Sequence, residues 1–297
     1  MIKIGEAIAK RLLGKDAEVK HLLGKDAAGR NLRTYPTDTF IVSYPKSGNT
    51  WTRFLVASLI HGGEPLTFLK ADQVIPSVDA MTRKFFDNVP HPRVIKSHFP
   101  FDQTYKRVIY IVRDPKDVAV SQYHYQIKRR VLQEGHPMEE FVPRFVAGET
   151  CPYGSWGENV GSWLAARQTN PNFLLLRYED MIRQTDVELV KIAEFLNIDP
   201  EPNRIRRAVE QSTADNMRKM EQKEAGKWES TKDTRKDKFF VRSAKAGEGK
   251  SAIPPACIAQ IESAWGRLMQ HLGYDLISGQ VPADSKTIDA LLEPATR

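Results

Sequence analysis

The 297-residue chain is predicted to form a single α/β domain, in which helices flank a central parallel sheet. Short apolar runs rich in β-branched residues alternate along the chain with longer amphipathic segments. This alternation is typical of parallel strands joined by right-handed helical crossovers. A chain of this length can bury a full core, and α/β domains of this size are commonly undivided.

Four strands are expected, and helices follow most of them. The predicted strands are residues 39–44, 93–98, 107–112 and 173–177. The predicted helices are 50–60, one that begins at Pro115, 156–168, 185–197, 203–212 and 253–272. Three irregular stretches are expected over the sheet, namely 64–92, 127–155 and a mobile, basic loop at 221–250. Residues 1–34 are predicted to be an N-terminal helical extension, 35–278 the domain and 279–297 a C-terminal tail.

The composition is that of an ordinary globular protein, with 41% hydrophobic and 27% charged residues. The net charge of +7 favours an anionic ligand, a nucleic acid or a membrane surface, and by itself selects none of them. Cys151 and Cys257 lie far apart without metal-ligand spacing, which favours a reduced, cytoplasmic protein without a metal. No run approaches the roughly 20 apolar residues of a membrane span, and no signal-peptide core is visible.

Residues 38–51 carry the strongest local signal, because an apolar strand breaks there into a small turn and then into a helix. The first amides of such a helix lack intrahelical partners and favour an anion. Gly48 permits close backbone approach, Lys46 supplies a cation, and the residues that donate further hydrogen bonds are Ser47, Asn49 and Thr50. The lysine precedes the glycine, unlike the standard nucleotide P-loop, so ATP is not implied.

Polar side chains also follow the other predicted strands. Lys46, His98, Arg113 and Tyr178 each stand at a strand end, and the carboxyl ends of parallel strands meet at one crevice. The Lys46 turn is predicted to hold one phosphate-like group, and Arg113 with Ser121 a second. A bisphosphorylated ligand follows from this spacing. His98 is the expected general base, because imidazole deprotonates hydroxyl groups near neutral pH.

Four motifs in this order resemble the cytosolic-type sulfotransferases, which use 3′-phosphoadenosine-5′-phosphosulfate (PAPS). Residues 44–51 are similar to their 5′-phosphosulfate loop and 110–121 to their 3′-phosphate motif. Residues 96–100 resemble the segment that carries their catalytic histidine, and 177–181 a further shared stretch. The resemblance implies a P-loop-nucleotide-hydrolase-like fold and transfer of a sulfuryl group from PAPS to a hydroxyl, or less readily an amine. The product is then adenosine 3′,5′-bisphosphate (PAP), and no metal is required.

The resemblance also implies a role for each matching residue. Lys46 contacts the phosphosulfate and its bridging oxygen, with the 47–50 turn around them, and Trp51 stacks on adenine. Arg113 and Ser121 bind the 3′-phosphate, Tyr178 touches the nucleoside, His98 is the base and Lys96 supports the transferring group. Trp51 also suits the apolar face of its helix, so core packing is the alternative role for it.

The carboxyl-terminal half departs from the family pattern. The family's R-K-G-x-x-G-D-W-K segment stands here as residues 242–250, which keep Arg242 but lose the tryptophan and the first lysine and glycine. Arg242 is therefore an expected 3′-phosphate ligand, and Ser212 is carried over near adenine. The family's short dimer motif is absent, with Pro254-Pro255 where its Thr-Val would be, which leaves the oligomeric state open.

Alternative functions are an atypical P-loop kinase and a non-enzymatic polyanion-binding module. No nucleic-acid-reading motif is present, and the Lys128-Arg129-Arg130 run is predicted to be a solvated face. The expected partner is a small, hydroxyl-bearing, partly apolar acceptor. Aromatic residues predicted to line its pocket are Phe68, Phe85, Phe86, Phe141, Tyr153 and Trp228.

Overall fold

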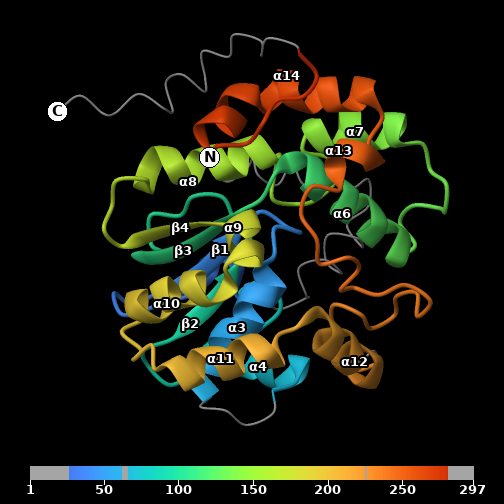
Figure 1. The fold of residues 1–297 in the computed structure, drawn as a ribbon. Helices are drawn as coiled ribbons and strands as arrows, with labels where there is room; N and C mark the ends of the chain where they lie inside the picture. The colour runs from blue at the N-terminus through green and yellow to red at the C-terminus, as the bar shows by residue number, and fades with distance from the viewer. Residues whose placement is uncertain (1–26, 62–65, 225, 280–297) are drawn as a thin grey trace.

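The computed structural model describes residues 27–61, 66–224 and 226–279 (Figure 1). Four parallel strands form one sheet in the order β2-β1-β3-β4. The strands are β1 (Thr39–Ser43), β2 (Val94–Ser97), β3 (Arg107–Val112) and β4 (Phe173–Arg177). The predicted α/β class with a central parallel sheet is confirmed, and the predicted strands match to within two residues.

Alternating side chains of the central strands divide the core between the two faces of the sheet. Phe40 and Val42 of β1 point into one hydrophobic cluster, and Ile41 between them points into the other. On the first face pack α6 (Pro115–Lys128), α7 (Met138–Val146), α8 (Trp156–Arg167) and α14 (Pro255–His271). On the second pack α3 (Asn49–His61), α4 (Phe68–Val74), α9 (Tyr178–Arg183), α10 (Thr185–Phe195) and α11 (Pro202–Gln211). Figure 1 shows these two helical layers above and below the strands.

Local sequence explains where the helices near the strand ends begin. The Asp114 side chain caps α6 by accepting from the Lys116 amide at 2.9 Å, and Pro115 occupies the first turn. Ser155 and Glu158 form a reciprocal capping box at the start of α8. These caps fix the helix starts close to the carboxyl edge of the sheet, where the predicted site residues lie.

The stretches predicted to be irregular contain further helices. The 64–92 stretch includes α4 and α5 (Arg83–Phe86), which the side chains of Thr67 and Thr82 cap. The 127–155 stretch includes α7. The 221–250 stretch takes the end of α12 (Ala214–Glu224) and the start of α13 (Gly249–Ala252). These short helices contain too few turns for a clear apolar period in the sequence.

The prediction of a solvated face at Lys128-Arg129-Arg130 is wrong for Lys128, which is buried. Its ammonium donates to the carbonyls of Arg235 and Lys238 and pairs with Glu221 at 3.3 Å. The sequence around Lys128 does not indicate these partners, because they come from a segment about a hundred residues away. In this structure Lys128 therefore ties the 226–248 segment to the end of α6.

Most of the predicted N-terminal extension, 1–34, and nearly all of the predicted tail, 279–297, lie outside the described residues. A short 3-10 helix at Gly29–Asn31 opens the described chain. Within the described part, none of the helices has the length and apolar character needed to cross a bilayer.

Candidate active site

The turn after β1 has the backbone geometry that an anion cradle requires. Lys46 and Gly48 both adopt positive φ angles, of 70° and 98°, and α3 begins at Asn49. Ser47 is fully buried, and among the described residues its hydroxyl has no hydrogen-bond partner. The Asn49 amide group donates back to the Ile41 carbonyl and to Ser43 Oγ, each at 3.3 Å. Asn49 thus braces the turn with its side chain and leaves its backbone amide at the helix N-terminus.

Tyr178 packs directly beneath this turn. A Cβ atom at Gly48 would stand 2.5 Å from Tyr178 Cδ2, so only glycine permits this approach. The Arg113 guanidinium lies 4.3 Å from the centroid of the Tyr178 ring, and the Trp51 ring meets Tyr178 edge-on at 6.0 Å. Three residues predicted to bind one nucleotide therefore lie in contact, one just after β3, one at the start of α9 and one on α3.

The Lys46 ammonium lies over two aromatic rings, 4.2 Å from the centroid of Tyr125 and 4.0 Å from that of Phe240. Burial, and after it the nearby Arg113 guanidinium, lower the pKa of Lys46 to about 7. An anion beside this ammonium would restore the charge that burial disfavours. The site is therefore prepared for a negatively charged group.

Arg113 is buried and joins the turn to the carboxyl-terminal segment. Its guanidinium donates to the Lys46 carbonyl at 3.2 Å and to the Lys245 carbonyl at 3.0 Å. Its Nε is buried without a partner in the described structure, as expected of a group awaiting an acceptor. Ser121 is half-buried on α6, which begins just after Arg113.

The 242–249 segment is pinned to the first turn of α6. Asp117 accepts the amides of Gly247 and Gly249, both at 2.7 Å. A Cβ atom at Gly249 would lie 2.6 Å from the Lys116 backbone, so the segment packs as closely as glycine allows. The segment that carries Arg242 is thus held against α6, and Arg113 donates to the Lys245 carbonyl within it.

His98 stands at the end of β2, and its ring orientation is fixed. Its Nδ1 lies 2.8 Å from the Ser43 carbonyl oxygen, which can only accept, so Nδ1 carries the proton. Burial, and after it the Lys96 ammonium, lower the pKa of His98 to about 3. The imidazole is then neutral at physiological pH, with the lone pair of Nε2 available. This is the protonation state of a general base.

Lys96 and Ser212 have partners that the sequence did not indicate. The Lys96 ammonium donates to Asp79 at 3.1 Å. The buried Ser212 hydroxyl donates to the Ala208 carbonyl at 2.6 Å, while the Ser212 carbonyl accepts from Trp51 Nε1 at 3.0 Å. Ser212 thus holds Trp51 in place through its backbone carbonyl, and its hydroxyl hydrogen-bonds to a carbonyl in the last turn of α11.

The aromatic residues predicted to line an acceptor pocket lie in different surroundings. Phe68, Phe86, Phe141 and Trp228 are buried in the core, where Phe68 stacks on Trp228 at 4.0 Å. Phe85 is half-buried and meets Phe86 edge-on. Tyr153 lies against His98, with ring centroids 5.4 Å apart. Of this set, the structure therefore brings Tyr153 to the histidine.

Sequence reasoning missed four residues of the site, namely Asp79, Tyr125, Glu248 and Phe240. Asp79 lies in the stretch predicted to be irregular, and Tyr125 and Phe240 are unremarkable aromatics in sequence. Glu248 offered a signal, because it is the acid of the segment that resembles R-K-G-x-x-G-D-W-K. Among the described residues, no group of three or more His, Cys, Asp and Glu side chains is placed to hold a metal ion.

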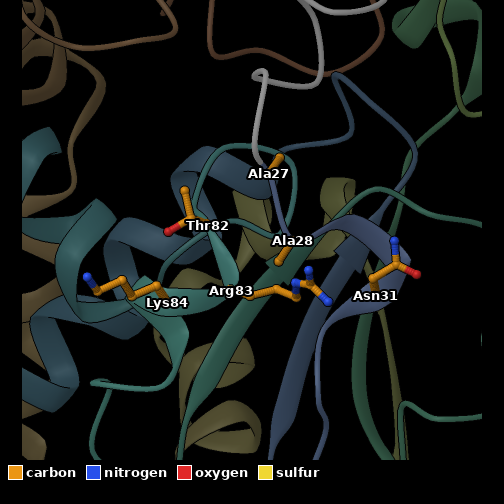
Figure 2. A pocket seen from close by; sticks show the side chains of 6 residues that line it. All are labelled: Ala27, Ala28, Asn31, Thr82, Arg83 and Lys84. Atoms are coloured by element: carbon orange, nitrogen blue, oxygen red, sulfur yellow. The ribbon is translucent and has the colours of Figure 1, made fainter.

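A pocket of about 310 Å³ lies elsewhere, beside the 77–82 segment that flanks β2 (Figure 2). Its lining residues are Ala27, Ala28, Asn31, Thr82, Arg83 and Lys84. None of the residues predicted to bind the donor or to act on the acceptor lines it. The candidate site is therefore defined by convergent side chains at the strand ends rather than by this pocket.

Comparison with known proteins gives the family. A family model described as "Sulfotransferase domain" matches residues 36–273. The chain belongs to this sulfotransferase family. The match confirms the resemblance noted from the four sequence motifs, and it covers both the strand-end residues and the 242–250 segment.

Curated sulfotransferases align with parts of the chain. Sulfotransferase 1B1 of Canis lupus familiaris is 32% identical over 177 residues, which are 54% of this chain and 59% of the relative. Sulfotransferase 1E1 of Rattus norvegicus is 28% identical over 251 residues, which are 79% of this chain and 84% of the relative. The alignment thus spans somewhat over half the length of the dog relative.

Solved structures share the sulfotransferase fold. A mouse sulfotransferase complexed with PAP superimposes with a TM-score of 0.67 at 22% identity, covering 91% of this chain and 93% of the mouse chain. A retinol dehydratase complexed with androsterone and PAP gives a TM-score of 0.65 at 21% identity, covering 86% and 87%.

Proposed function

We propose that the protein transfers a sulfuryl group from PAPS to a hydroxyl of a small, partly apolar molecule and releases PAP. The observation that carries this proposal is the fixed His98 ring at the end of β2, whose Nδ1 donates to the Ser43 carbonyl. Ser43 is also the last residue before the Lys46 turn. One backbone carbonyl thus orients the base relative to the turn that would hold the phosphosulfate.

The reaction needs one proton transfer and one exchange of bonds at sulfur. His98 Nε2 takes the acceptor's hydroxyl proton as the acceptor oxygen forms its bond to sulfur. The bond from sulfur to the bridging phosphate oxygen breaks, and Lys46 stabilises the charge that develops on that oxygen. As in phosphoryl transfer, fixed amides and cations contribute by positioning and by electrostatic stabilisation. No covalent enzyme intermediate is required.

The two ends of PAPS are assigned to two groups of residues. The amides of residues 47–51 and Lys46 hold the 5′-phosphosulfate, and the unpartnered Ser47 hydroxyl supports an oxygen-rich ligand there. The 3′-phosphate is assigned to Arg113, Ser121 and Arg242. The buried, unpartnered Nε of Arg113 supports this assignment.

The remaining contacts concern the nucleoside. We assign adenine to Trp51, whose ring orientation is fixed by the hydrogen bond from its indole N–H to the Ser212 carbonyl. Tyr178, whose ring meets Trp51 edge-on, is assigned to the nucleoside as well. Ser212 is proposed to act there through its position behind Trp51.

Thermal unfolding tests this proposal against the kinase alternative. A ligand that binds the native state alone raises the midpoint by mass action. We predict that PAP raises the midpoint without magnesium, and that ADP or ATP does so much less because neither carries a 3′-phosphate. A rise with Mg-ATP and none with PAP would favour a P-loop kinase and defeat the proposal. PAP binding without consumption of PAPS by any of a panel of phenols and alcohols would favour a non-enzymatic binding module.

A further inference from the structure

Asp79 lies beside the proposed catalytic histidine and has no role in the function proposed above. The segment before it runs along the free edge of β2, where the Lys96 amide donates to the Pro76 carbonyl at 2.9 Å and the Val78 amide donates to the Lys96 carbonyl at 3.0 Å. These bonds place Asp79 at the carboxyl end of β2. Lys96 and His98 stand at the same end.

The Asp79 carboxylate is buried and incompletely satisfied. Its Oδ2 accepts from the Lys96 ammonium at 3.1 Å and from the Ser77 hydroxyl at 3.3 Å. Its Oδ1 is buried without a hydrogen bond of regular geometry among the described residues, although the Tyr153 hydroxyl lies close enough to interact with the carboxylate. The Lys96 side chain is itself only 15% exposed. A buried ion pair contributes little to stability, because the cost of desolvating both charges offsets their attraction.

The charges around this pair act on His98. Although burial opposes ionisation of Asp79, the Lys96 ammonium lowers the pKa of the carboxyl. Burial lowers the pKa of Lys96, and Asp79 partly offsets that effect, whereas the Arg53 guanidinium on α3 adds to it. Burial and then Asp79 raise the pKa of the Tyr153 hydroxyl. Asp79 is thus the carboxylate that opposes the cations around His98.

We propose that Asp79 is a positioning residue of sulfuryl transfer. It holds the Lys96 ammonium beside His98, where the ammonium can interact with the sulfuryl group during transfer. This inference rests on the proposed function, in which Lys96 supports the transferring group. Without Asp79 the lysine would be a buried, unpaired cation, free to leave the site or to lose its proton. Asp79 is therefore proposed to act through Lys96, without contacting the donor or the acceptor.

A double-mutant cycle on Asp79 and Lys96 tests the proposal. The variants are Asp79→Asn, Lys96→Met and the pair together, and PAPS consumption is followed with 2-naphthol as the acceptor and in parallel with water alone. We predict that Asp79→Asn lowers kcat at least tenfold and leaves the Kd for PAP within threefold. In the Lys96→Met background, Asp79→Asn should lower kcat less than twofold, because Asp79 acts through Lys96 and that side chain has been removed.

The pH dependence gives a second readout that a structural role would not move. With PAPS saturating, so that Lys46 stays charged on its anion, the alkaline limb of kcat should move to lower pH by about one unit in Asp79→Asn. The sign follows because removal of the carboxylate lowers the pKa of Lys96 further. If Asp79→Asn does not fold, kcat of the Lys96→Met protein can still be compared with kcat of the double variant, in which neither member of the ion pair remains charged. The two values should differ by less than twofold.

Asp38, which immediately precedes β1, offers a matched control because it too is a buried carboxylate paired with a cation. Arg93 immediately precedes β2, and its guanidinium pairs with the fully buried Asp38 at 2.6 Å, at the end of the strand opposite the site. Asp38→Asn should lower the unfolding midpoint and leave kcat and its pH profile unchanged. The inference is overturned if Asp79→Asn behaves like Asp38→Asn, or if it costs the same with and without Lys96. A wild-type protein that neither binds PAP nor consumes PAPS would instead refute the proposed function.

Discussion

The Arg242 guanidinium forms a two-point ion pair with the Glu248 carboxylate, through a contact of 3.3 Å between Nη1 and Oε1 and a second between Nη2 and Oε2. The Ser243 hydroxyl donates to the same carboxylate at 2.8 Å. An arginine fork and a hydroxyl around one anionic group are also what a phosphate would require. Glu248 therefore pairs with Arg242, one of the three residues proposed to bind the 3′-phosphate.

Glu248→Gln is predicted to tighten the binding of PAP. Removing the carboxylate charge frees Arg242 for the 3′-phosphate, and the gain should be about two- to fivefold, since a partly exposed ion pair contributes little. Calorimetric titration measures the change in Kd. Adenosine 5′-monophosphate, which lacks the 3′-phosphate, is the matched ligand and should bind both proteins equally. An equal change for both nucleotides, or weaker PAP binding, would remove Glu248 from the 3′-phosphate site.

PAP binding is predicted to weaken as pH rises above about 7. The pKa of Lys46 is lowered to about 7 in the free protein, and a bound anion raises it again. Binding above this pH therefore takes up a proton, and the affinity should fall by up to about tenfold for each pH unit. Titration in buffers of different ionisation enthalpy measures the uptake directly. In Lys46→Met the affinity should be at least about tenfold lower at pH 6.5, and the proton uptake should vanish.

Gly48→Ala is predicted to weaken PAP binding at least tenfold and to lower the unfolding midpoint. The new methyl group would stand 2.5 Å from the Tyr178 ring, at a backbone φ of 98° that disfavours any side chain. Gly226→Ala is the control, because a Cβ there meets nothing within 4 Å. Normal PAP binding by Gly48→Ala would mean that the turn does not contact the donor as proposed.

The sequence placed the strand-end residues well, because their location follows from topology alone. Lys46, His98, Arg113 and Tyr178 each follow a short apolar run, and parallel strands bring such positions to one edge. The start of α6 at Pro115 was an equally local signal. The roles of these residues toward PAPS stay predictions, while their convergence is a property of the fold.

The residues that sequence reasoning missed are set by contacts between distant segments. Lys128 looked solvated because its partners, Glu221 and two carbonyls, come from a segment about a hundred residues away. Phe240 covers Lys46 for the same reason. Asp79 reaches Lys96 because the preceding residues, 76–78, pair with the edge of β2. The sequence of these residues shows no alternation of apolar and polar side chains that would predict this pairing. Tertiary contacts of this kind follow from packing rather than from local pattern.

The most direct test of the account is the rate of PAPS consumption by His98→Ala at saturating acceptor, compared with wild type. Because the neutral imidazole is the proposed base, the variant should lose at least about a hundredfold in kcat, the lower end of general-base contributions. Its Kd for PAP should stay within threefold of wild type, since His98 is not assigned to the donor. A variant that binds PAP and consumes PAPS at a near-normal rate across pH would contradict the central claim.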